Sequence, residues 1–134
     1  AFMDRYVDWH VEILNTVPVD ILGNVTWLPE GLMPQYDALW TPARMKKVID
    51  AAVAKGTALE ISSKYEIPRK PFLELARKAG AKFSFGSNGR YPNMGKLDYS
   101  LKVAAELRLE AKELFRPGAA PTALARWKPK GSAR

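Results

Sequence analysis

Three short apolar stretches of this chain end in polar residues whose types could carry chemistry. The stretches cover 19–23, 57–62 and 82–87, and the polar residues at their ends are Asn24, Glu60, Ser62, Asn88 and Arg90. If the stretches are parallel strands, their carboxyl ends share one edge of a sheet, where α/β folds build their sites. Amide, hydroxyl and guanidinium groups there could bind an anion, and Glu60 could serve as a general base or a lone metal ligand.

Each of these residues also has a structural interpretation. Glu60 could simply pair with a neighbouring lysine or arginine, and Asn88-Gly89 could be a turn that needs a positive φ. Lys64 could contact an anion or lie in a solvated loop. His10 lies on an apolar helical stripe, so we expect it to be packed in the core. It is the only histidine, so the chain contains no histidine pair for catalysis or metal binding.

A long aromatic segment follows the first stretch. Residues 24–41 include Trp27, Met33, Tyr36 and Trp40, and connections of this length are often binding loops or lids. An aromatic plug that caps the mouth of a barrel is an equally good interpretation. We keep Trp27 as a candidate ligand-binding residue.

The elements between the stretches read as helices. Apolar spacing predicts a helix over 2–17, a second helix from the Thr41-Pro42 start to Gly56, a third that stops at Gly80, a fourth near 97–105 and a last turn near 110–115. The expected buried positions of the second and third helices are Met45, Val48, Ile49, Ala52 and Val53; and Phe72, Leu75, Ala76 and Ala79. The fourth helix is marked by Leu97, Leu101, Ala104 and Ala105. Strands that alternate with helices predict an α/β fold with a parallel sheet.

The second stretch indicates what kind of sheet this is. Leu59 and Ile61 share one strand face, whereas Ala58, Glu60 and Ser62 share the other. A doubly wound sheet is apolar on both faces, so a polar second face favours a barrel wall. A full barrel needs about 200 residues or more, and we therefore expect half of a TIM-like barrel.

The three stretches resemble the last strand motifs of the PHP (polymerase and histidinol phosphatase) family. The residues that carry the resemblance are Asp20-Ile21-Leu22-Gly23-Asn24, Ala58-Leu59-Glu60-Ile61-Ser62 and Lys82-Phe83-Ser84-Phe85-Gly86-Ser87-Asn88-Gly89-Arg90. The similarity runs from about Val7 to Pro117. It implies half of a distorted (β/α)7 barrel and the hydrolysis of phosphoesters by two or three divalent metals, such as manganese, zinc or magnesium.

This chain departs from the family at its metal ligands. The family usually has histidine at the position of Asn24, and aspartate and histidine at the positions of Asn88 and Arg90. Asparagine is a weak neutral ligand and arginine cannot bind a metal. We therefore expect a phosphoesterase-like domain that is catalytically impaired or incomplete. The alternative is a non-catalytic small-anion-binding or structural domain, with Asn24, Trp27, Ser62, Lys64, Asn88 and Arg90 as candidate ligand contacts.

Charge and composition limit the partners of this chain. The net charge of the 134 residues is +7, but residues 117–134 contain four basic and no acidic side chains. The remaining 17 basic and 14 acidic residues nearly balance, so we do not expect nucleic-acid binding. We expect a domain over 1–116 followed by an extended or disordered basic tail over 117–134.

Several expectations concern the setting of the domain. The chain has no cysteine, no apolar run long enough for a membrane span and no signal-peptide pattern, so we expect a cytoplasmic protein. It begins at Ala1 without methionine. Half of a barrel exposes two strand edges, and we therefore expect either an amino-terminal half elsewhere in a longer protein or a homo-oligomer.

Overall fold

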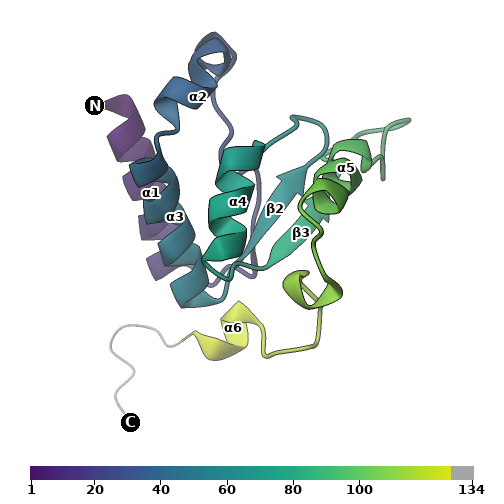
Figure 1. Cartoon of the computed structure of the whole chain (residues 1–134). Helices are drawn as coiled ribbons and strands as arrows, with labels where there is room; N and C mark the ends of the chain where they lie inside the picture. The colour runs from purple at the N-terminus through teal and green to yellow at the C-terminus, as the bar shows by residue number, and fades with distance from the viewer. Residues whose placement is uncertain (128–134) are drawn as a thin grey trace.

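Residues 1–127 of the computed structural model form an α/β fold in which three parallel strands alternate with helices. In chain order the elements are α1 (Phe2–Thr16), β1 (Ile21–Leu22), the 3-10 helix η1 (Glu30–Gln35), α2 (Tyr36–Leu39), α3 (Pro42–Lys55), β2 (Ala58–Ser62), α4 (Lys70–Lys78), β3 (Phe83–Gly86), α5 (Asp98–Glu106), the 3-10 helix η2 (Ala111–Glu113) and α6 (Ala123–Arg126) (Figure 1). The predicted alternation of helices and strands is confirmed.

The sheet is open and has the order β1-β2-β3. All pairs are parallel, and the register places Leu59 of β2 between Leu22 of β1 and Phe83 of β3. Within residues 1–127 these strands do not close into a barrel, so the structure supports the coarser part of the prediction, a parallel α/β sheet.

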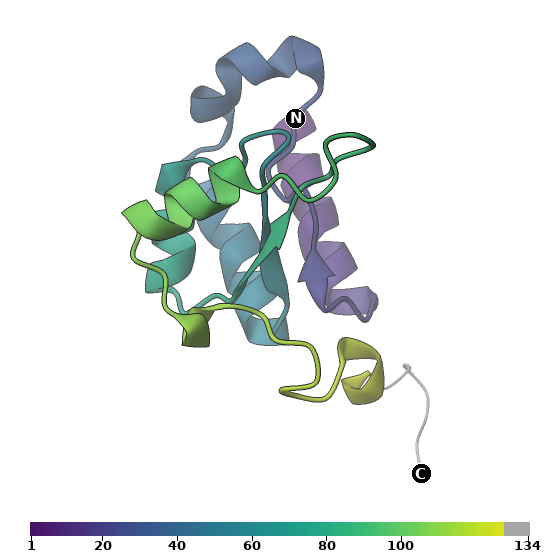
Figure 2. The ribbon, with the colours of Figure 1, turned by 90° about the vertical axis from the view of Figure 1, so that its right-hand side faces the viewer.

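The long helices α1, α3, α4 and α5 lie along one face of the sheet (Figures 1 and 2). Leu59 and Ile61 of β2 are fully buried in the core, whereas Glu60 between them is half-buried on the second face. The predicted alternation is therefore confirmed for these three positions. It leaves Glu60 on the face of the sheet without the long helices.

The helix boundaries follow from local signals. Thr41 Oγ1 accepts a hydrogen bond from the backbone N–H of Arg44 at 3.4 Å, and Pro42 is the first residue of α3. Gly56, with φ of 65°, ends α3 in a left-handed conformation that suits glycine. These capping predictions are confirmed.

Some predicted buried positions are wrong. Val53, Leu75 and Ala79 are exposed, and Leu73 is buried. In the fourth helix, which Leu101 and Ala105 helped to mark, these two residues are exposed, and Ser100 and Val103 are buried. Helix α5 shows the reason, because the Ser100 hydroxyl donates a hydrogen bond to the carbonyl of Ile61 at 2.7 Å. That tertiary contact turns the face with Ser100 and Val103 toward the sheet and rotates Leu101 outward.

The long segment after β1 is anchored in the core. Tyr36 and Trp40 are fully buried, and both bond to Thr26: the Tyr36 hydroxyl donates to Thr26 Oγ1 at 2.5 Å, and Trp40 Nε1 donates to the Thr26 carbonyl at 3.0 Å. The Trp40 ring also packs edge-on against Phe72. These two aromatic residues are structural, which fits a packed plug better than a lid, whereas Trp27 is exposed.

The tail is not extended throughout. Residues 123–126 form α6, and the backbone N–H of Ala123 donates to Asp20 Oδ1 at 2.6 Å. The prediction of an extended or disordered tail is therefore wrong for α6, and residues 128–134 lie outside the described part of the chain. No helix within residues 1–127 combines the length and the apolar character that crossing a membrane requires.

Candidate functional site

The carboxyl ends of the three strands meet at one edge of the sheet, as the parallel pairing requires. Gly23 and Asn24 follow β1, Ser63 and Lys64 follow β2, and the loop over 87–97 follows β3. Most of the predicted site residues come from these segments. The structure separates them into three groups. These are a polar cluster around Glu60, a cavity lined by Lys64 and Arg90, and a groove lined by aromatic residues that include Trp27.

Glu60 is the centre of the polar cluster. Its Oε2 accepts a hydrogen bond from the backbone N–H of Asn24 at 2.8 Å. The carboxylate lies between two glycines of the flanking segments, because a Cβ added to Gly86 would lie 1.7 Å from Glu60 Oε1 and one added to Gly23 would lie 3.3 Å from Oε2. Because Gly23 and Gly86 have no side chains, the Glu60 carboxylate has space between the segments on either side of β2. No ion pair of Glu60 exists within residues 1–127, so the alternative interpretation, a pair with a lysine or arginine, finds no support there.

Asn24 and Asn88 complete the polar cluster. Asn88 Nδ2 donates to Asn24 Oδ1 at 3.3 Å. Both residues have positive φ, 49° for Asn24 and 41° for Asn88, a conformation that asparagine tolerates better than most residues. The positive φ expected at Asn88 is therefore found, and this backbone conformation brings its amide to Asn24.

Lys64 and Arg90 line one cavity of about 350 Å³ beside the polar cluster, which we call the anion pocket after the three cations in its walls. Its lining residues are Ser63, Lys64, Ser87, Gly89, Arg90, Tyr91, Asn93, Lys96 and Asp98. The three cations come from two different loops, one after β2 and one after β3. Lys96 was not among the predicted site residues, although its place in the same loop as Arg90 could have indicated it.

Hydrogen bonds hold the walls of the anion pocket. Ser63 Oγ and Ser100 Oγ are 2.7 Å apart, and Ser63 Oγ also accepts from the backbone N–H of Ser100 at 3.0 Å. The backbone N–H of Gly89 donates to Ser87 Oγ at 3.3 Å. The Tyr99 hydroxyl in the first turn of α5 donates to the Pro68 carbonyl at 2.7 Å, and burial raises its pKa to about 12. Tyr99 is therefore neutral and fixes the start of α5 beside the pocket.

Ser62 lies apart from the other candidates. Its side chain is fully buried, and within residues 1–127 its Oγ has no hydrogen-bond partner. Ser62 does not line the anion pocket, which is bordered instead by the next residue, Ser63. The structure therefore does not place Ser62 beside Lys64 and Arg90.

Trp27 belongs to the aromatic groove, a second cavity of about 350 Å³ on the other side of the sheet edge. The groove is lined by Tyr6, Trp9, His10, Ile13, Leu22, Gly23, Asn24, Trp27 and Tyr65. His10 is nearly buried there, and its Nδ1 lies 2.8 Å from the Tyr6 carbonyl. Burial lowers the pKa of His10 and raises that of Tyr6. His10 is thus a packed neutral residue, as the sequence predicts.

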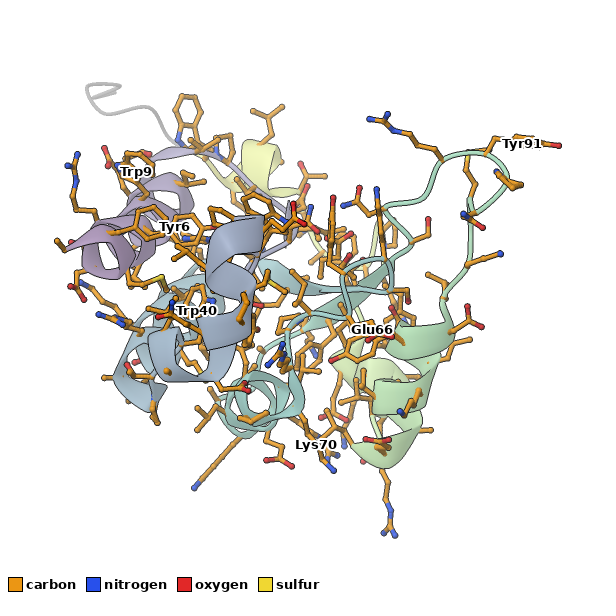
Figure 3. The ribbon with its side chains drawn as sticks, turned by 90° about the horizontal axis from the view of Figure 1, so that it is seen from above. Tyr6, Trp9, Trp40, Glu66, Lys70 and Tyr91 are labelled. Carbon is orange, nitrogen blue, oxygen red and sulfur yellow. The ribbon has the colours of Figure 1, made fainter. Side chains whose placement is uncertain are left out.

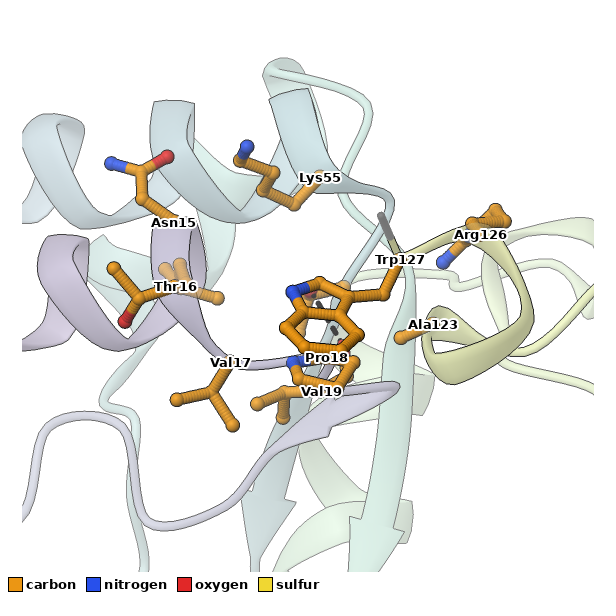
Figure 4. A pocket seen from close by; sticks show the side chains of 11 residues that line it. Asn15, Thr16, Val17, Pro18, Val19, Lys55, Ala123, Arg126 and Trp127 are labelled. Atoms are coloured by element: carbon orange, nitrogen blue, oxygen red, sulfur yellow. Dashed lines mark hydrogen bonds between the residues drawn. The ribbon is translucent and has the colours of Figure 1, made fainter. Parts of the chain in front are cut away.

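A larger cavity of about 420 Å³ lies at the opposite end of the sheet (Figure 4). It is enclosed by the end of α1, the segment before β1, the end of α3 and α6, with Lys55, Arg126 and Trp127 in its walls. It contains none of the predicted site residues. The candidate site is therefore the carboxyl edge, where the polar cluster and the anion pocket adjoin.

The donor set of the polar cluster does not fit the metal cluster that the PHP resemblance implies. Within residues 1–127 no three histidine, cysteine, aspartate or glutamate side chains gather as metal ligands. Glu60 supplies one carboxylate, and the Asn24 side-chain oxygen already accepts from Asn88. Two or three divalent metals need several anionic or imidazole ligands, which these residues do not provide.

The arrangement can nevertheless bind a ligand. The anion pocket offers two lysines and one arginine, and the polar cluster beside it offers a carboxylate and two amides. Together these groups can hold a small molecule by charge and hydrogen bonds. Comparison with protein-family models, with curated proteins and with solved structures finds no match to this chain.

Proposed function

We propose that this domain binds a small phosphorylated or carboxylated molecule in the anion pocket. The observation that carries the proposal is that Lys64, Arg90 and Lys96, from two loops at the carboxyl edge of the sheet, line one cavity. The same cavity contains a single acidic side chain, Asp98. Its charge is therefore net positive, and an anion would reduce the repulsion among the cations.

The three cations suit such an anion in different ways. The planar guanidinium of Arg90 can form two parallel hydrogen bonds to a phosphate or a carboxylate. Lys64 and Lys96 act as compact charges on flexible stems, which adds attraction with less directional preference. All three side chains are exposed, so salt in the solution should weaken the binding.

We infer further that the domain has a PHP-like ancestry with impaired hydrolysis. The order of the three strand motifs supports this inference, as do the long helices on one face of the sheet, an arrangement expected for a segment of a (β/α)7 barrel. The substitutions to Asn24, Asn88 and Arg90 argue against the family's metal chemistry in this chain. Glu60 remains the one acidic residue of the polar cluster that could assist a reaction.

Calorimetric titration with inorganic phosphate tests the binding proposal. We expect Arg90→Gln and Lys64→Gln each to weaken binding by about tenfold, since each removes one charge-assisted contact. Lys46→Gln is the matched control, because Lys46 pairs with Asp50 on the outer side of α3. Binding by the wild type that these two pocket variants leave unchanged would refute the assignment of the anion pocket.

Turnover of p-nitrophenyl phosphate with added manganese, zinc or magnesium tests the hydrolase alternative. We expect no turnover above the rate of the added metal alone. Turnover that requires the protein and disappears in Glu60→Gln would instead favour a working phosphoesterase. Absence of both phosphate binding and turnover would refute the proposed function in either form.

A further inference from the structure

Helix α1 carries two apolar stripes. The first consists of Met3, Val7, His10 and Leu14 and is buried in the core. The second, which we call the outer stripe, consists of Phe2, Tyr6, Trp9 and Ile13, and of Val17 directly after the end of the helix. Tyr6 is half-buried, and the other four are exposed, up to 56% for Trp9. Figure 3 shows Trp9 at the margin of the molecule on the side of α1.

The outer stripe continues across the aromatic groove onto two loops. Trp27 and Tyr65, at 38% and 36% exposure, line the same groove as Trp9 and Ile13. An aromatic side chain has an area of about 200 Å², so the exposed apolar surface is on the order of 500 Å². This area is in the range of the largest apolar patch on a typical monomer, and such patches are often functional.

The spacing of the outer stripe is that of a coiled-coil seam. Phe2, Tyr6, Trp9 and Ile13 follow each other at intervals of four, three and four residues. This spacing corresponds to alternating d and a positions of a heptad and keeps one narrow apolar seam on the helix. The seam therefore suits another helix better than a flat or irregular surface.

The charged residues of α1 indicate which helix packs against the seam. Asp4 and Asp8 face away from the seam, toward α3, where they pair with Arg44 and Lys47. Arg5 and Glu12 lie beside the seam, on the flank away from the buried stripe, are exposed, and form no ion pair within residues 1–127. They are seven residues apart, so they occupy the same heptad position.

We propose that the outer stripe packs against the outer stripe of a second copy of this chain, with the two α1 helices antiparallel. A two-fold axis near Trp9 then places Arg5 of each copy beside Glu12 of the other. Each α1 helix thus supplies one positive and one negative partner to the two ion pairs between the copies. An interface of this kind is isologous, as in most homodimers.

The sheet edges are poorer candidates for self-association. Strand β1 is only two residues long, so pairing of its free edge adds few hydrogen bonds. The outer edge of β3 is partly occupied already, because Phe83 bridges Leu114 and the backbone N–H of Phe115 donates to the Phe83 carbonyl at 2.7 Å. Burial of both outer stripes together with Trp27 and Tyr65 of each copy would cover about 1,000 Å², which is at the low end of specific interfaces. We therefore expect a reversible dimer with a dissociation constant on the order of micromolar.

Sedimentation velocity of the full chain, from about 0.05 µM to about 100 µM, tests the dimer. We expect the wild type to change from monomer to dimer across this range, and Trp9→Lys to remain monomeric. Tyr91→Lys is the matched control, because Tyr91 is an exposed aromatic residue at the tip of the loop on the opposite side (Figure 3). A wild type that stays monomeric, or a dimer that persists in Trp9→Lys, would overturn the proposal.

A charge exchange tests the antiparallel register. Arg5→Glu and Glu12→Arg each place like charges together twice in the dimer, so each should weaken association by about tenfold. The double variant Arg5→Glu with Glu12→Arg restores both pairs and should recover wild-type association. Single variants without effect, or a double variant no better than the singles, would overturn this register. Circular dichroism of each variant shows that the fold is retained.

Discussion

The carboxylate of Glu60 fills the space that a side chain on Gly86 would need. A methyl group at Gly86 would lie 1.7 Å from Glu60 Oε1 and 2.6 Å from its carboxyl carbon. The Glu60 side chain of β2 therefore extends over β3, where Gly86 has no side chain to block it. This relationship decides how Glu60 reaches Asn24 at the carboxyl edge.

Gly86→Ala should displace Glu60 and lower the free energy of unfolding by about 1 kcal/mol, measured by urea denaturation. The cost stays small because Glu60 is half-exposed and can rotate away from the new methyl group. In a Glu60→Ala background the same change should cost much less, since the clash is then absent. Gly31→Ala is the control, because no atom lies within 4 Å of the added methyl group. Equal costs in the two backgrounds would contradict the contact.

Ser62→Ala should raise the free energy of unfolding by about 1 kcal/mol, because it removes a buried hydroxyl that has no partner within residues 1–127. Thermal or urea unfolding measures this change. Phosphate affinity should stay at the wild-type value, since Ser62 does not line the anion pocket. A loss of phosphate binding in this variant would show that Ser62 contributes to the site after all.

The stability of the domain should fall as the pH drops below about 6.5, the ordinary pKa of histidine. Burial lowers the pKa of His10 in the folded state, so the unfolded chain binds a proton at a higher pH than the folded one. Stability is therefore complete above that pH and decreases below it. The carboxyls of Asp4 and Glu113, whose pKa values are lowered from 3.8 and 4.5, titrate in more acidic solution, below about pH 5.5.

Denaturant unfolding between about pH 5.5 and pH 7.5 measures this dependence. His10→Gln should make stability nearly independent of pH in that interval, because glutamine does not titrate. A wild-type profile that is flat from pH 7.5 to 5.5, or one that His10→Gln leaves unchanged, would contradict the assignment to His10.

Tyr36→Phe should lower the free energy of unfolding by about 1–3 kcal/mol, because it leaves buried polar groups without a partner. The Tyr36 hydroxyl donates to Thr26 Oγ1 and also accepts from the backbone N–H of Arg69 at 3.3 Å. Tyr91→Phe is the matched control, since Tyr91 is almost fully exposed, and we expect it to change stability by less than about 0.5 kcal/mol. Equal stability of the two variants would show that the bonds of Tyr36 add nothing.

The sequence by itself determined the order of helices and strands in this protein. The stop at Gly56 and the start at Thr41-Pro42 are local signals, since φ preferences and capping act within a few residues. The alternation that buries Leu59 and Ile61 and leaves Glu60 half-exposed is also local, because a strand has a period of two. The gathering of Asn24, Glu60 and Asn88 at one edge follows from the parallel order of the strands.

Only the tertiary structure decided which faces and partners these elements have. The buried face of α5 depends on a hydrogen bond between Ser100 and Ile61, residues far apart in the chain. The separation of Trp27 from Arg90 into different cavities depends on how two loops pack after their strands end. In the sequence, the outer stripe of α1 cannot be distinguished from the buried stripe beside it, because both consist of apolar residues at helical spacing. Which of the two is covered depends on how the other elements pack against α1.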